Sequence, residues 1–112
     1  MTHDPVVIVA ARRTPIGAFQ GVFSGVTAPQ LGTVAVKAAV AAAGIQPADV
    51  QEIVMGCVLP AGMGQAPARQ AGINAGLPVA TSATTINKMC GSGMKAIMMA
   101  ADQIRSGDVQ IA

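Results

Sequence analysis

Residues 85–96 read TINKMCGSGMKA, and this stretch predicts both the local fold and the chemistry of the chain. Residues 84–89 are expected to form a strand, whereas residues 90–106 have helical spacing and are followed by Gly107, a typical helix end. Cys90 is therefore expected where a strand gives way to a helix. The unsatisfied N–H groups and the positive dipole end of a helix start favour a thiolate there.

The residues that follow this cysteine are small. Gly91, Ser92 and Gly93 allow a bulky substrate to approach the sulfur closely. The arrangement is analogous to the nucleophile elbow of hydrolases, although their G-x-S-x-G signature is missing. A single cysteine is more often a small buried hydrophobe, and position alone leaves both interpretations of Cys90 open. Cys57 lies inside an apolar stretch and is expected to be structural.

Strands and helices alternate along the rest of the chain. Thr27 to Gln30 has the spacing of a capping box, and Gly44 is expected to end the helix that follows. The alternation predicts an α/β layer with mostly parallel strands. The sequence ends inside an expected strand, so residues 1–112 are expected to form an incomplete domain. Strands are expected at 6–11, 52–59, 84–89 and 109–112, and helices at 28–43, 66–75 and 90–106.

Composition excludes several classes of protein. Hydrophobic residues make up 52% of the 112 residues and charged residues 11%, which excludes a disordered segment. The net charge of +2 without a basic run predicts no nucleic-acid partner, and no apolar run reaches the ~20 residues that span a bilayer. Two distant cysteines and the absence of a secretion signal favour reduced thiols and a cytoplasmic protein. No metal-ligand cluster is visible.

Three stretches, in order, resemble the thiolase family. VVIVAARRTPIGAFQG (6–21) looks like the family's first strand and loop, and GQAPARQA (64–71) with AGLP (75–78) is also similar. NKMCGSGMKAI (87–97) resembles the nucleophile motif, especially that of the biosynthetic acetoacetyl-CoA type. A C-G-S-G match alone would be weak. Three long matches in order identify the chain as the N-terminal portion of a thiolase.

The resemblance implies an acyl-CoA acetyltransferase. Cys90 would be acylated by acyl-CoA, and a Claisen condensation with a second acetyl-CoA would give acetoacetyl-CoA; the reverse is thiolysis of a 3-ketoacyl-CoA. The backbone N–H of Cys90 is a candidate oxyanion donor. Met89, Gly91 and Met94 are candidates for the acyl pocket, while Met89, Met94, Met98 and Met99 also suit a core. The substrates are coenzyme A thioesters, and no cofactor or metal is expected.

The family's full fold has five layers, helix–sheet–helix–sheet–helix, with helices on both faces of a mostly parallel mixed sheet. A homodimer or homotetramer is implied, with the strand at 84–89 and the Arg69 region facing a second subunit. Arg69 is expected to have a structural partner, and Arg12 and Arg13 are expected to anchor a loop. The catalytic histidines and second cysteine of thiolases lie later in the chain, and His3 is not expected to replace them.

Three other interpretations remain. A non-catalytic thiolase-like fragment or interaction module would be unreactive to acyl-CoA, and the 112 residues alone are expected to be inactive. A ketoacyl synthase has a related fold, but the motif around Cys90 and the loop after residue 11 resemble thiolases more closely. A redox cysteine protein is disfavoured because the sequence has no C-x-x-C.

Overall fold

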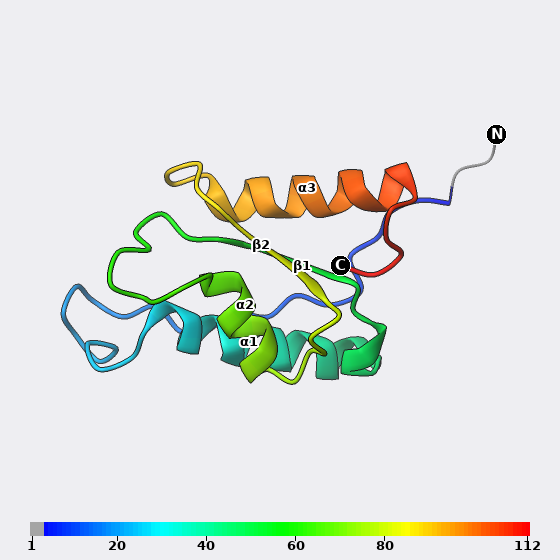
Figure 1. Ribbon diagram of the computed structural model, residues 1–112. Helices are drawn as coiled ribbons and strands as arrows, with labels where there is room; N and C mark the ends of the chain where they lie inside the picture. Colours follow the sequence, from blue (N-terminus) through cyan, green and yellow to red (C-terminus); the bar gives the residue numbers. More distant parts are fainter. Residues whose placement is uncertain (1–3) are drawn as a thin grey trace.

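The computed structural model describes residues 4–112 (Figure 1). His3 lies outside these residues. None of the helices described combines the length and apolar character needed to cross a bilayer. The elements, in chain order, are α1 (Ala28–Ala43), the 3-10 turn η1 (Pro47–Asp49), β1 (Glu52–Gly56), α2 (Pro67–Asn74), β2 (Ser82–Ile86) and α3 (Ser92–Ser106).

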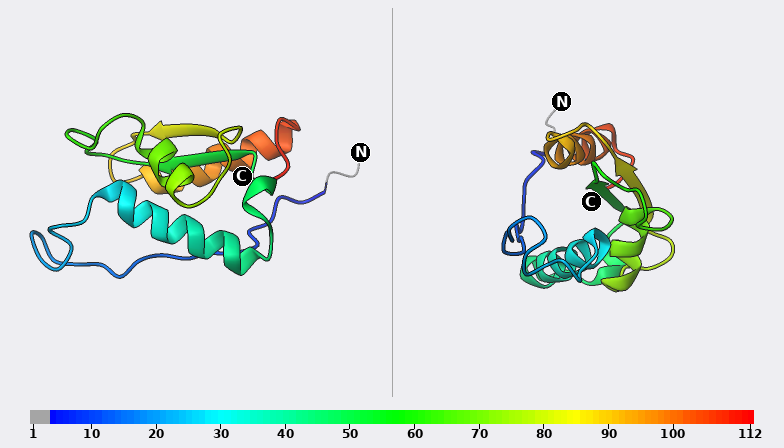
Figure 2. Two further views of the ribbon diagram at one scale, coloured as in Figure 1. Left: turned by 60° about the horizontal axis from the view of Figure 1, so that its bottom comes forward. Right: turned by 90° about the vertical axis from the view of Figure 1, so that its left-hand side faces the viewer.

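The sheet of the described region consists of β1 and β2, which run parallel. Their register places Glu52 opposite Ser82 and Gly56 opposite Ile86, so both strands end at the same edge. Parallel neighbours need a crossover connection, which α2 provides. In Figures 1 and 2, α3 lies on one face of the sheet, and α1 and α2 lie on the other. The predicted α/β layer with parallel strands and helices on both faces is confirmed.

Helix α1 has the ends that its sequence predicts. The Thr27 hydroxyl accepts a hydrogen bond from the Gln30 amide (3.3 Å), and the Gln30 side chain accepts one from the Thr27 amide (2.8 Å). This reciprocal pair satisfies two donors that the helix itself leaves without partners. Gly44 ends the helix with φ at 70°, a left-handed conformation that glycine adopts without steric cost.

The core is a small cluster of aliphatic side chains. Val50, Ile53 and Leu77 are its buried centre, and α1 contributes Val36 and Val40. Helices α1 and α2 pack closely through their smallest residues. A Cβ atom built on Gly32 would lie 3.2 Å from the Cβ atom of Ala71, tighter than most such contacts. The glycine–alanine composition thus sets the distance between these helices.

Two of the four predicted strands are wrong. Residues 6–11 are extended but form no ladder with any described residue, and Ile8 remains 75% exposed. Residues 109–112 are not a strand either. The Gln51 side-chain oxygen accepts hydrogen bonds from the backbone amides of Gln110 (2.7 Å) and Ile111 (3.2 Å). The backbone amide of Gln51 donates to the Ile111 carbonyl (3.0 Å). A side chain therefore takes the place of a second strand's carbonyls.

The remaining differences concern boundaries and faces. The strands expected at 52–59 and 84–89 are β1 and β2, and the helix expected from residue 90 begins at Ser92. The buried face of α3 carries Ser92 and Ala96. Met94 is 72% exposed and Met98 49% exposed, since they lie on other sides of a helix that turns ~100° per residue. The core interpretation of the methionines is therefore wrong for these two and for Met89, which is 70% exposed; Met99 is half-buried.

Candidate functional site

Cys90 lies in the short turn that joins β2 to α3, and it is exposed. Because β1 and β2 are parallel, this turn lies at the shared carboxyl edge of the sheet, beside the loop that follows β1 (Figure 1). Ligands of parallel α/β sheets bind at that edge. The expected strand–turn–helix position is correct, although Cys90 precedes the first helical residue by two positions.

Ser92 holds the turn to the start of α3. Only 4% of this residue is exposed. Its hydroxyl oxygen accepts a hydrogen bond from the Lys88 amide (2.8 Å), and the same hydroxyl donates to the Met89 carbonyl (2.6 Å). The Ser92 amide also donates to the Met89 carbonyl (3.2 Å). One buried side chain therefore closes a ring around Cys90, a role that the sequence interpretation, which considered only the small size of Ser92, missed.

Asn87 holds the other end of the turn. Its side-chain oxygen accepts a hydrogen bond from the Met89 amide (3.0 Å), the local pattern in which an asparagine binds the backbone two residues on. Its side-chain nitrogen donates to the Val58 carbonyl (3.3 Å) in the loop after β1. An asparagine at the end of a strand predicts such a turn, so this role was visible in the sequence and was missed.

The residue before the candidate nucleophile has a strained backbone. Met89 has φ at 51°, in the left-handed region that costs a non-glycine residue roughly 1–2 kcal/mol. The Asn87 and Ser92 hydrogen bonds hold its amide and its carbonyl in this conformation. Strain of this kind persists only where the surroundings fix it, and it clusters at functional sites.

The backbone N–H groups near Cys90 differ in their partners. The Gly91 amide donates to the Lys88 carbonyl (3.0 Å), and the Ser92 amide is used within the turn. For the amide of Cys90, the described part of the chain provides no acceptor. Gly91 is the residue before α3 and has an ordinary φ of −90°.

The other expected residues lie apart from Cys90 or have structural partners. Cys57 follows β1, is half-buried, and has its sulfur 4.0 Å from the Met63 sulfur, which suits the structural role expected for it. The Arg69 guanidinium donates to the carbonyls of Val79 (3.4 Å) and Thr81 (2.5 Å), so it anchors the loop before β2. Within residues 4–112, no group of three or more His, Cys, Asp or Glu side chains is placed to hold a metal ion.

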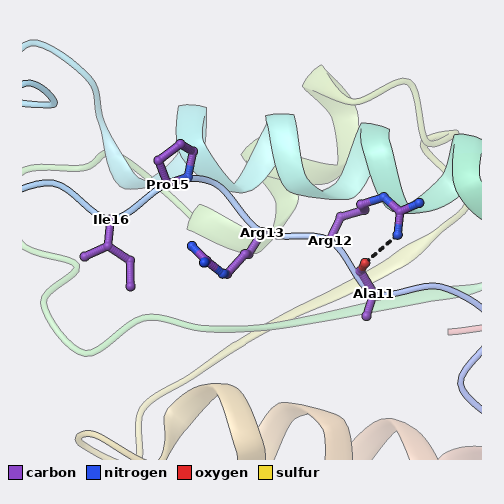
Figure 3. Close-up of a pocket in the computed structure, with 5 residues that line it drawn as sticks. All are labelled: Ala11, Arg12, Arg13, Pro15 and Ile16. Atoms are coloured by element: carbon purple, nitrogen blue, oxygen red, sulfur yellow. Dashed lines mark hydrogen bonds between the residues drawn. The ribbon is translucent and has the colours of Figure 1, made fainter.

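A separate hollow of about 750 Å³ lies along residues 11–16 (Figure 3). Its lining comes from one extended segment and includes Arg12 and Arg13. Among residues 4–112, each guanidinium donates to a carbonyl next to it in sequence, Ala11 for Arg12 (2.7 Å) and Thr14 for Arg13 (3.0 Å). Neither bond ties the loop to another segment, so the anchoring expected of these arginines stays a prediction. The hollow contains no nucleophile, and Cys90 remains the candidate centre.

These features define a class: an α/β protein with an exposed cysteine at a tight strand-to-helix turn. The chain belongs to the thiolase family, because the family model "Thiolase, N-terminal domain" matches residues 6–112. Over 106 residues it is 56% identical to the acetyl-CoA acetyltransferase of Cupriavidus necator, covering 95% of this chain and 27% of that protein. It is 54% identical over 110 residues to the mitochondrial acetyl-CoA acetyltransferase B of Xenopus laevis, covering 98% and 26%.

The same family appears among solved structures. The Acat5 thiolase from Ascaris suum, crystallised in complex with coenzyme A, superposes with a TM-score of 0.86 at 40% sequence identity. The match covers 89% of this chain and 26% of that chain. This chain therefore spans about a quarter of the length of the relatives that it matches. The predicted family is confirmed, and the predicted fold is confirmed for this N-terminal part.

Proposed function

We propose that this chain supplies the nucleophile of an acyl-CoA acetyltransferase and that Cys90 carries the acyl group. The observation that carries the proposal is the place of Cys90: exposed, at the carboxyl edge of two parallel strands, in a turn braced by Asn87 and Ser92. A nucleophile needs both access and a fixed position, and this turn provides both.

The proposed reaction has two steps. The Cys90 thiolate attacks the carbonyl carbon of acetyl-CoA, the bond from that carbon to the coenzyme A sulfur breaks, and the coenzyme A thiolate leaves and takes up a proton. A second acetyl-CoA then loses an α-proton, which in the sum of the two steps balances the proton taken up by the coenzyme A thiolate, and its carbanion attacks the acetyl group on Cys90. This forms the carbon–carbon bond of acetoacetyl-CoA and releases the Cys90 thiolate. Thiolysis of a 3-ketoacyl-CoA is the same sequence in reverse.

The choice of substrate rests on the relatives. Two of them are named acetyl-CoA acetyltransferases, and the matching crystal structure contains coenzyme A. The backbone amide of Cys90 is the proposed donor to the oxyanion that forms during acylation. Met89 and Met94 have exposed apolar side chains and are, with Gly91, the proposed contacts for the acyl group. No cofactor enters either step.

The test is mass spectrometry of the full-length protein after brief exposure to acetyl-CoA. A gain of one acetyl group on the peptide that contains Cys90 is the expected result. Cys57→Ala should keep the modification, whereas Cys90→Ala should lose it. Because Cys57 is half-buried and Cys90 is exposed, the two cysteines of one chain serve as matched controls. A folded protein without acetylation would favour the non-catalytic interaction module, and acetylation on Cys57 in place of Cys90 would contradict the role proposed for Cys90.

We also propose that the protein forms a homodimer or homotetramer through the region of β2. Two observations support this. Within residues 4–112, β2 pairs with β1 on one side only, and Val79 in the loop before β2 is 85% exposed. An open strand edge beside an apolar side chain favours association. Light scattering during gel filtration checks the proposal, and a monomer at micromolar concentration would contradict it.

A further inference from the structure

The last residue of β1 touches the first turn of α3. A Cβ atom built on Gly56 would lie 2.5 Å from the carbonyl carbon of Ser92, 2.7 Å from the Gly93 nitrogen and 2.7 Å from the Ser92 Cβ atom. Real Cβ atoms essentially never make contacts under 3.0 Å. Two of the three atoms belong to the helix backbone, so no side chain can swing aside to make room.

Glycine is needed at position 56 for space and not for its backbone freedom. Gly56 pairs with Ile86 in the regular parallel ladder and does not have a positive φ. To reach an ordinary contact of 3.4 Å, the start of α3 would have to move by about 0.9 Å relative to β1. The β1–β2 ladder holds Gly56 in place, and the Cys57 amide continues it by donating to Ile86 (2.9 Å).

A shift of Ser92 would be transmitted to Cys90. The Ser92 hydroxyl binds the Lys88 amide and the Met89 carbonyl, so the two residues before the cysteine are tied to the residue at the start of α3. The Gly91 amide adds a bond to Lys88 (3.0 Å). The turn and the start of α3 therefore move as one unit, and the surface against which that unit rests is Gly56.

We propose that Gly56 is a positioning residue for Cys90: the missing side chain lets α3 begin against β1, which fixes the distance of the thiol from the carboxyl edge of the sheet. The inference rests on the proposed role of Cys90 as the acylated residue. A misplacement of ~1 Å in a catalytic geometry can cost ~100-fold in rate. Gly56→Ala is therefore expected to lower kcat for acetyl transfer by ~10- to 100-fold, with a much smaller change in KM.

The experiment compares Gly56→Ala with Gly72→Ala in the full-length protein. Gly72 lies in α2 in the same small core, but a Cβ atom there meets Ile53 and Leu77 at 3.4 Å, an ordinary contact. Three measurements are made on each variant: acetyl transfer, the pH profile of Cys90 alkylation by iodoacetamide, and the circular dichroism spectrum. Alkylation needs no acyl-CoA, so it reports the position of Cys90 even if the proposed function fails.

Support would consist of a normal circular dichroism spectrum for Gly56→Ala, a changed alkylation profile and lower kcat, with Gly72→Ala close to the unsubstituted protein in all three. A folded Gly56→Ala variant with unchanged alkylation and kcat would overturn the inference. If Gly56→Ala does not fold, the comparison moves to Ser92→Ala, which keeps the Cβ atom that packs against Gly56 and removes the two hydrogen bonds that tie α3 to the turn. Ser92→Ala must then alkylate differently from the unsubstituted protein, and an equal profile would overturn the inference.

Discussion

Replacing Ser92 by alanine removes the hydroxyl that closes the turn around Cys90. The substitution leaves the Cβ atom in place, so the packing against Gly56 is unchanged and only the two hydrogen bonds are lost. The Met89 carbonyl keeps a partner, the Ser92 amide at 3.2 Å, whereas the Lys88 amide loses the acceptor at 2.8 Å. The main cost is therefore the loss of one part-buried hydrogen bond, that of the Lys88 amide.

The expected magnitude follows from that donor. Leaving a buried N–H group without an acceptor costs ~1–3 kcal/mol, and partial exposure of the turn places the value at about 1–2 kcal/mol. If the free energy of local opening falls by this amount, the hydrogen of the Lys88 amide exchanges with solvent ~5- to 30-fold faster. The Cys90 thiol should also react with iodoacetamide under a changed pH profile, because the turn no longer holds it in one position.

Hydrogen exchange followed by mass spectrometry on a peptide that spans residues 86–94 measures this effect. Ser106→Ala is the matched control, since Ser106 also donates to a carbonyl in its own helix, that of Gln103 (2.9 Å), but is exposed and distant in sequence from the turn. Unchanged exchange in Ser92→Ala would refute the reasoning, because the Lys88 amide would then have to be protected by something other than the Ser92 hydroxyl.

Three further predictions concern the scaffold, each measured as a shift in the urea unfolding midpoint. Thr85→Val should cost about 1–2 kcal/mol, because the Thr85 hydroxyl oxygen accepts from the Ala68 amide (2.9 Å) and caps α2 from the neighbouring strand; a cost below about 0.3 kcal/mol would contradict this. Met89→Gly should stabilise the folded protein by up to about 1 kcal/mol, because glycine relieves the strain of the left-handed backbone at residue 89. Met94→Gly, inside α3, should destabilise it by about 1 kcal/mol. If both substitutions destabilise the protein, the backbone at Met89 is not strained. Arg69→Met should cost roughly 2–4 kcal/mol, because two carbonyls of the loop before β2 lose a charged donor; a neutral result would make the guanidinium dispensable.

Much of the fold follows from local signals in the sequence. The capping box at Thr27 and the glycine at position 44 define α1 because the hydrogen bonds that end a helix come from neighbouring residues. The strands at 6–11 and 109–112 were wrong for the opposite reason. An apolar run predicts burial, but a strand also needs a neighbour with free amides and carbonyls, and that depends on residues far away in the sequence. Gln51 satisfies the backbone of residues 110 and 111 with a side chain, which no periodicity indicates.

The candidate nucleophile was visible in the sequence, whereas most of the residues that hold it were not. Cys90 was found from its small neighbours and its place before a helix. Asn87 at the end of a strand is a local signal for a turn. Ser92 acts through hydrogen bonds whose existence depends on the left-handed backbone of Met89, and that backbone is a result of folding. Gly56 precedes Cys90 by 34 positions, and nothing in its local sequence indicates contact with α3.

Two glycines of this chain show how differently the same residue type acts. At Gly44, φ is 70° and a Cβ atom would meet nothing within 4 Å, so a larger residue would cost backbone strain and leave its surroundings alone. At Gly56, φ is ordinary and the space is filled by the start of α3, so a larger residue would leave its own backbone unstrained and move the helix. The first cost falls on stability alone. The second falls on the position of the one exposed thiol among residues 4–112, because a Cβ atom at Gly56 would collide with Ser92, the residue that braces the Cys90 turn. In a chain with two phenylalanines and thirteen glycines, close backbone contacts take the place of large side chains in positioning the site.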